Sequence, residues 1–154
     1  MESLLRHTLA TLAYRLGKVL RDAPPEFETY QASPGARTPA QILAHIGDLM
    51  EWALSMAEGR PAWHDSAPLA WPQEVARFFH AIQALDARIV AGGLESGKAE
   101  GLFQGPIADA LTHTGQLAML RRMAGSPMKG ENYFVAEIVA GRLGPDQAPP
   151  RREF

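Results

Sequence analysis

The chain contains five histidines, and two of them occupy positions where they can do chemistry together. His113 follows Asp109 by four residues. Residues four apart project from one face of a helix, so this carboxylate and imidazole would point the same way. His45 lies three residues after Ile42 and four before Leu49. It therefore belongs to the apolar stripe of its own segment and would face the protein interior.

Two neutral imidazoles and one carboxylate form a ligand set suited to a divalent ion such as Zn, Ni or Fe(II). If the helices that carry His45 and His113 are neighbours, these residues and Asp109 leave coordination positions open for water. A bound ion lowers the pKa of such a water toward about 7. The alternative is a core histidine at position 45, bonded to a backbone carbonyl, and a surface pair of Asp109 with His113 worth about 0.2–0.5 kcal/mol. Spacing alone does not decide between the two interpretations.

Other polar residues near His45 are weaker candidates. Asp48 and Glu51 follow it by three and six residues, so either could support a ligand, act as a general base, or belong to a solvated helix face. Trp52 lies on the same apolar stripe as His45, so it could line a pocket, although a position in the core is favoured. The run His64 to Ser66 places histidine, aspartate and serine in sequence. Such neighbours rarely form a catalytic triad, because nucleophile, base and orienting residue must converge in space.

The segment that carries His45 has the clearest helix start in the chain. Thr38 is a favourable N-cap, Pro39 suits the first helical position, and Gln41 completes a capping box. Gly59 is expected to end this helix.

Glycine and proline divide the rest of the chain into further helical segments. Helices are expected over about 3–21, 39–58 and 105–123, with a short fifth helix over about 133–140. A further helix is expected after Trp71-Pro72; it carries Val75 to Ile89 and is closed by Gly92-Gly93. No stretch alternates apolar and polar residues for long enough to predict a strand. The pattern predicts an all-α fold, a four-helix bundle with a short additional C-terminal helix. Long loops on both sides of the second helix leave room for a crossover, and periodicity does not choose between that and an up-and-down order.

Length and composition limit the number of domains and the classes of function that the chain can have. With 154 residues, 46% of them hydrophobic, the chain fits one domain, placed at residues 1–144, with a flexible proline-rich tail at 145–154. The absence of cysteine excludes disulfides, thiolate zinc clusters and cysteine nucleophiles. A net charge of -2 without a dense basic block gives no support for nucleic-acid binding. No stretch approaches the ~20 apolar residues of a membrane span or forms a signal peptide, so we expect a cytoplasmic protein.

Two segments resemble motifs of the DinB-like superfamily of metal-binding helical bundles. The first is RTPAQILAHI (Arg37–Ile46), which resembles the superfamily's second-helix motif. The second is THTGQLAMLRR (Thr112–Arg122), which is similar to its histidine-glycine-glutamine motif on a later helix. The resemblance extends from the first helix to about Gly144. It implies a four-helix bundle with a divalent metal in a cavity at one end.

The usual ligands of that family are three histidines, and the resemblance assigns two of them to His45 and His113. The third lies four residues before the second, where this chain has Asp109. Aspartate can ligate, but it changes the charge of the site and prefers harder ions; it is also compatible with a weakened site. The expected metal ligands are therefore His45, Asp109 and His113. Gln116 would orient a ligand or support the helix contact, and no catalytic residue is assigned.

Members of the superfamily include thiol-dependent S-transferases and isomerases, and similar proteins often form homodimers. The resemblance thus implies a metal-dependent enzyme that performs transfer or hydrolysis on a small substrate, with a low-molecular-weight thiol as a candidate cosubstrate and a homodimer as the assembly. A metal-bound thiol would react as thiolate without any protein cysteine. The alternative is a non-catalytic, dimeric binding module with a vestigial metal site, which the aspartate at position 109 favours.

Overall fold

The computed structural model describes residues 2–154 and contains no β-strand within them. Its long helices are α1 (Glu2–Leu20), α2 (Pro39–Ala57), α3 (Trp71–Val90) and α5 (Ala108–Met123). The short helix α4 (Lys98–Leu102) and the π-helical turn η2 (Phe103–Ile107) lead directly into α5. The predicted all-α class and the four main helices are confirmed. No helix in the described part of the chain is both long enough and apolar enough to cross a membrane.

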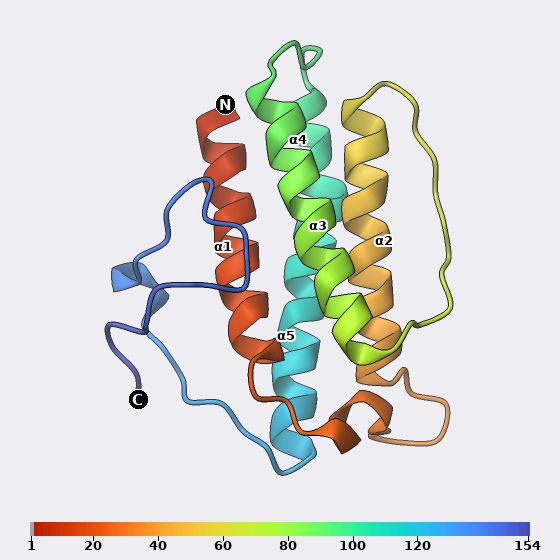
Figure 1. Cartoon of the computed structure of the whole chain (residues 1–154), viewed down its shortest axis with the longest axis vertical. Helices are drawn as coiled ribbons and strands as arrows, with labels where there is room; N and C mark the ends of the chain where they lie inside the picture. The colour runs from red at the N-terminus through yellow and green to blue at the C-terminus, as the bar shows by residue number, and fades with distance from the viewer. Residues whose placement is uncertain (1) are drawn as a thin grey trace.

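The helices form a bundle in which chain neighbours are not always spatial neighbours (Figure 1). α1 packs against α3 and α5, and α2 packs against the same two helices. α2 and α3 run in the same direction, because the connection over residues 58–70 returns along the length of the bundle (Figure 1). The crossover that the sequence left open is therefore present, and it places α2 directly beside α5.

The start of α2 is fixed by the predicted capping box. The hydroxyl of Thr38 accepts a hydrogen bond from the backbone N–H of Gln41 at 3.3 Å, and Oε1 of Gln41 accepts one from the backbone N–H of Thr38 at 2.8 Å. These bonds satisfy amide groups that have no partner within the helix. They also set the helical phase that turns Ile42, Ile46 and Leu49 into the core.

The helix that carries His113 begins earlier than the sequence predicts. Its expected start at Gly105 and Pro106 is wrong, because helical structure begins at Lys98 and continues through Pro106. The N–H of Ala108 bonds to the carbonyl of Phe103, five residues back, which is the hydrogen bond of a π turn. This wider turn accommodates a proline that lacks an amide hydrogen.

The predicted helix over residues 133–140 is absent. In its place is a single 3-10 turn, η3 (Tyr133–Val135), whose start is capped by the side chain of Asn132. A helix of eight residues is marginal in water unless an apolar face packs. Phe134 is 95% exposed, and Ile138 is the apolar residue of this segment that packs against the core. One such contact does not make the apolar face that would stabilise a helix here.

The C-terminal segment instead lies beside α1 (Figure 1). Glu131 is buried and accepts hydrogen bonds from the hydroxyl of Tyr14 at 2.6 Å and from Nζ of Lys18 at 2.8 Å. Burial and the bond to Glu131 raise the pKa of Tyr14. Lys18 also pairs with Glu153 at 2.9 Å, so α1 contacts the tail directly. The flexibility of residues 145–154 stays a prediction.

Candidate metal centre

The fold brings His45 on α2 together with Asp109 and His113 on α5. One possible ligand atom from each residue lies within 4.8 Å of the other two. Nε2 of His45 is 3.5 Å from one carboxylate oxygen of Asp109, and Nε2 of His113 is 3.4 Å from the other. The three residues predicted from spacing and resemblance therefore meet, and they form a group that could hold a metal ion.

The distances in this group match converging metal ligands better than a hydrogen-bonded pair. A charge-assisted hydrogen bond between imidazole and carboxylate would bring nitrogen and oxygen to about 2.7–2.9 Å. Two ligands at about 2.0–2.1 Å from a tetrahedral zinc ion lie about 3.3 Å apart. The observed 3.4 and 3.5 Å are close to the second value, but they involve the two different oxygens of Asp109, and the three ligand atoms together lie within 4.8 Å. Within the described chain, neither contact meets hydrogen-bond geometry.

Gln116 orients the ring of His113. Its side-chain oxygen, Oε1, lies 2.8 Å from Nδ1 of His113. Because an amide oxygen only accepts, Nδ1 of His113 donates this bond and therefore carries the ring proton. Nε2 is then unprotonated and faces Asp109, as a metal ligand requires. The supporting role expected for Gln116 has a geometric basis here.

Aromatic rings surround His45. Its ring lies perpendicular to that of His113, with centroids 4.8 Å apart, and edge-on to Trp63 at 5.7 Å. Trp63 in turn contacts Trp52 at 5.6 Å. Sequence reasoning favoured the core for Trp52 and gave Trp63 no role, because the latter lies in a loop whose path no local pattern indicates.

The centre is open on the side of Asp109. The side chain of Asp109 is 47% exposed, against 19% for His45 and 13% for His113. His45 borders a polar hollow of about 400 Å³ at the start of α2. Asp109 borders a second hollow of about 450 Å³, lined also by Trp52 and Thr112. A small molecule could therefore reach the centre from either hollow.

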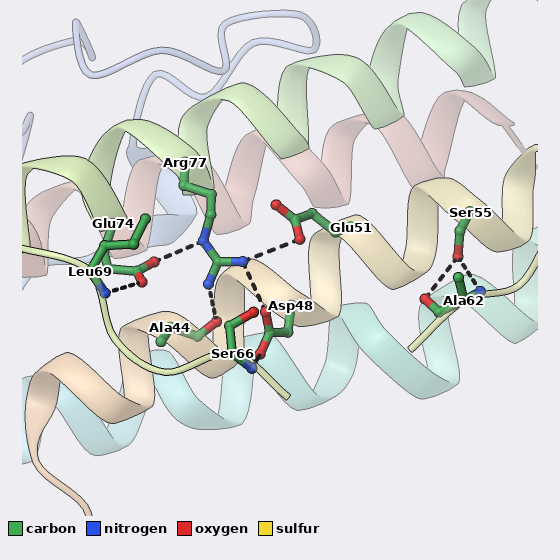
Figure 2. Close-up of polar contacts among 9 residues, drawn as sticks. All are labelled: Ala44, Asp48, Glu51, Ser55, Ala62, Ser66, Leu69, Glu74 and Arg77. Atoms are coloured by element: carbon green, nitrogen blue, oxygen red, sulfur yellow. Dashed lines mark hydrogen bonds and ion pairs between the residues drawn. The ribbon is translucent and has the colours of Figure 1, made fainter. Parts of the chain in front are cut away.

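Asp48 and Glu51 do not belong to the centre. Both pair with Nη1 of Arg77 from α3, at 2.8 and 3.2 Å (Figure 2). The second oxygen of Asp48 accepts a hydrogen bond from the backbone N–H of Ser66 at 2.9 Å. Burial alone would raise the pKa of Asp48, but the bonds from Ser66 and Arg77 outweigh it and lower that pKa. With both oxygens committed, Asp48 is not the general base that its position relative to His45 suggested.

Arg77 is the residue that sequence reasoning missed. Besides these two carboxylates, its Nε donates to Glu74 at 2.9 Å and its Nη2 donates to the carbonyl of Ala44 at 2.7 Å (Figure 2). The sequence held one signal, a lone arginine directly before Phe78 on the apolar face of its helix. The acids that surround Arg77 could not be found from spacing, because two of the three lie on another helix.

The loop over residues 58–70 is tied to this network and to α2. The backbone N–H of Leu69 donates to Glu74 at 2.8 Å, and that of Ala62 donates to Ser55 at 3.0 Å (Figure 2). These bonds hold the loop before and after Trp63. The run His64 to Ser66 is exposed, and no hydrogen bond joins its three side chains within residues 2–154, so a triad is not formed there.

Comparisons with protein-family models, curated proteins and solved structures gave no match for this chain. The features of this chain that point to a function are therefore the geometry of the centre and the two motifs.

Proposed function

We propose that this protein is a divalent-metal-dependent enzyme of the DinB-like type that performs transfer or hydrolysis on a small substrate. The observation that carries the proposal is the convergence of His45, Asp109 and His113 at separations suited to a shared ion. Two motifs far apart in the sequence supply these ligands, as the resemblance implies.

The donor set suits the proposed chemistry. Two neutral imidazoles and one carboxylate would hold a divalent ion with a net charge of about +1, and three protein ligands leave positions for water or a thiol. When bound, such an ion lowers the pKa of an adjacent water or thiol and so supplies a nucleophile near neutral pH. The protein's own part is to orient the ligands: Gln116 holds the proton of His113 on Nδ1, away from the centre.

The direct test is metal analysis of protein purified without added metal, followed by zinc and nickel titration. We expect about one ion per chain in the wild type and loss of binding in His45→Ala and His113→Ala. His80→Ala is the matched control, because His80 is exposed on α3. Unchanged metal content in both centre variants would exclude this site.

A second function is favoured by one observation. Asp109 lies within ion-pair distance of both imidazoles, so protonation of either ring would give the carboxylate a charged partner without an ion. On that basis the alternative is a non-catalytic, dimeric binding module in which the centre is vestigial. It predicts no tightly bound metal at any stoichiometry. Both candidates retain the homodimer as a proposal, which light scattering of the purified chain would check.

A further inference from the structure

The two histidines of the centre are held in different ways. The ring of His113 is fixed by the 2.8 Å contact between its Nδ1 and the side chain of Gln116. For His45, no hydrogen bond from the described residues reaches either ring nitrogen, and the carboxylate of Asp109 lies 3.5 Å from Nε2. A histidine ring turns easily, because its second side-chain torsion is not confined to narrow staggered minima. A metal-binding histidine therefore needs a partner that sets the direction of its ring.

Trp63 is placed to set this direction by packing. Its ring meets that of His45 edge to face, at 73° and with centroids 5.7 Å apart. This arrangement is favourable because the positive edge of one ring meets the negative face of the other. The indole of Trp63 is itself met edge to face by Trp52 of α2, at 82° and 5.6 Å. With His113 at 4.8 Å from His45, four rings form a continuous series from α2 through the loop to the centre.

The backbone on both sides of Trp63 is attached to α2. The N–H of Ala62, directly before it, donates to the hydroxyl of Ser55 at 3.0 Å (Figure 2). Three residues after it, the N–H of Ser66 donates to the carboxylate of Asp48 at 2.9 Å (Figure 2). Both acceptors lie on the helix that carries the first histidine. The indole therefore keeps its place relative to that helix without an ion being bound.

Trp63 differs from the other apolar residues of its loop. Residues 58–70 are exposed throughout, and Trp63 itself is 46% exposed. A single exposed apolar side chain is ordinary on a protein surface, and Leu69, 49% exposed in the same loop, is of that kind. Trp63 has in addition two edge-to-face partners, and one of them is a candidate metal ligand.

From these contacts we propose that Trp63 is a positioning residue of the metal centre. Its indole, held by Trp52 and by the two attachments of the loop, fixes the ring of His45 so that Nε2 points toward Asp109. The inference rests on the proposed function for the identity of the centre. Trp63 acts on the ion only through His45, so its removal should weaken metal binding without removing a ligand.

Zinc affinity, measured by competition against a chromophoric chelator, tests this role. We expect Trp63→Ala to weaken zinc binding by about 3- to 10-fold, which corresponds to the loss of one aromatic pair. Trp63→Phe keeps an aromatic ring at this position and should retain most of the affinity. Leu69→Ala is the matched control, because it truncates an equally exposed apolar side chain of the same loop, and it should leave zinc affinity unchanged. Equal affinities in Trp63→Ala and Leu69→Ala would overturn the inference.

A double-mutant cycle tests whether the attachment of the loop acts through the indole. Ser55→Ala removes the acceptor for the N–H of Ala62, so it should weaken zinc binding, but less than Trp63→Ala does. In the Trp63→Ala background the same change should have no further effect, because two residues that act through one contact are not additive. Additive losses would contradict the proposed route from the loop to His45.

Chelator-treated protein separates this inference from the proposed function. Nuclear Overhauser contacts between the ring protons of His45 and His113 report whether the first ring faces the second, as the 4.8 Å separation requires. The wild type and Leu69→Ala should show these contacts, and Trp63→Ala should lose them. If the wild type binds no metal but the contacts depend on Trp63, the metal-centre proposal fails and the orienting role of Trp63 stands.

The opposite result is equally distinct. If zinc binds, and both the ring contacts and the zinc affinity of Trp63→Ala equal those of the wild type, the positioning role is wrong. The metal-centre proposal would then be unaffected, because its ligands do not include Trp63.

Discussion

Asp109 determines the character of the centre at the scale of single residues. An aspartate in place of a third imidazole reduces the charge of a metal-loaded centre by one unit and adds a hard oxygen ligand. Its side chain is also the most exposed of the three, which places open coordination positions toward solvent. The choice of metal should therefore depend on this position more than on either histidine.

Asp109→His tests that dependence. Three imidazoles favour zinc and nickel over manganese, so the ratio of zinc to manganese affinity should rise by about an order of magnitude. Competition against a chromophoric chelator measures both affinities in the wild type and in the variant. An unchanged ratio would mean that Asp109 is not a ligand.

Gln116 should matter without touching the ion. Residues that hold a ligating histidine typically change metal affinity by about 10–100-fold when they are removed. We expect Gln116→Ala to weaken zinc binding within that range, measured by the same competition. Gln73→Ala, at an exposed glutamine on α3, should have no effect. Equal affinities in the two variants would contradict the role of the 2.8 Å contact with His113.

The sequence reveals residues of the centre to different degrees. Asp109 and His113 are one helical turn apart, so their common direction follows from local geometry alone. His45 joins them only because α2 packs against α5, which the two motifs suggested and periodicity could not. The contact between Trp63 and His45 depends on the path of a loop fixed by distant side chains, and nothing near Trp63 in the sequence indicates it.

At the scale of secondary-structure elements, the contact between α2 and α3 depends on one small residue, Gly47. A Cβ atom at Gly47 would lie 2.7 Å from the guanidinium carbon of Arg77. Arg77 cannot easily move away, because it is bonded to three carboxylates and a carbonyl. The glycine therefore allows the buried arginine to lie flat against α2.

Gly47→Ala should accordingly destabilise the protein, by about 1–3 kcal/mol as in other overpacked cores. Chemical denaturation followed by circular dichroism gives the free energy of unfolding. Gly101→Ala is the matched control, since a Cβ there meets no atom within 4 Å and the helix should gain up to about 1 kcal/mol. Equal free energies of unfolding for the two variants would show that Arg77 can yield.

The attachment of the loop to α2 should depend on pH through Asp48. Its pKa is lowered in the folded protein from an ordinary value of 3.8, so its ionised form stabilises the fold above that pH. That contribution is lost as the pH falls below about 3.8 and through the folded-state pKa. Asp48→Asn should be less stable than the wild type at pH 7, by about 1–3 kcal/mol, since a hydrogen-bonded charge is removed.

Denaturant melts of both proteins between pH 7 and pH 3 measure this difference, which should shrink at the acidic end. Asp65→Asn is the control, because Asp65 lies in the same loop but is exposed. A difference between wild type and Asp48→Asn that stays constant down to pH 3 would contradict the lowered pKa.

The elements themselves were predictable where the signal was local. Thr38, Pro39 and Gln41 marked the start of α2, since every bond of a capping box lies within four residues. Pro106 misled because proline favours a helix start, and only the bond from Ala108 to Phe103 shows that the helix passes through it. The apolar run after Asn132 resembled a helix, but helix formation there needed packing that the bundle does not offer.

At the scale of the whole molecule, a bound metal should stabilise the folded protein against unfolding, because its ligands come from two helices that separate on unfolding. An ion that binds only the folded state stabilises it by about 2.7 kcal/mol at a hundred times its dissociation constant. Thermal melts of zinc-loaded protein, with and without chelator, should therefore differ in midpoint. In His45→Ala the two melts should coincide. A wild-type midpoint that chelator does not move would favour the non-catalytic binding module.

The arrangement of the bundle was only partly visible in the sequence. Loop lengths allowed either an up-and-down order or a crossover, and the hydrogen bonds that hold residues 58–70 along α2 and α3 settle it. A homodimer stays a prediction.

The wide turn η2 has a consequence for which mutations the bundle can accept during evolution. Leu102, the last residue of α4, and Ile107, the last residue of the π turn, are both buried. The π turn lies between α4, which packs on α2, and α5, which packs on α1 and α2. Its extra residue changes the direction in which the side chains of α5 project relative to those of α4. From Ile107 onward the ordinary helical period sets the direction of Asp109 and His113. Mutations that remodel the upper rim of the bundle around Lys98 can accordingly accumulate without rotating the metal ligands.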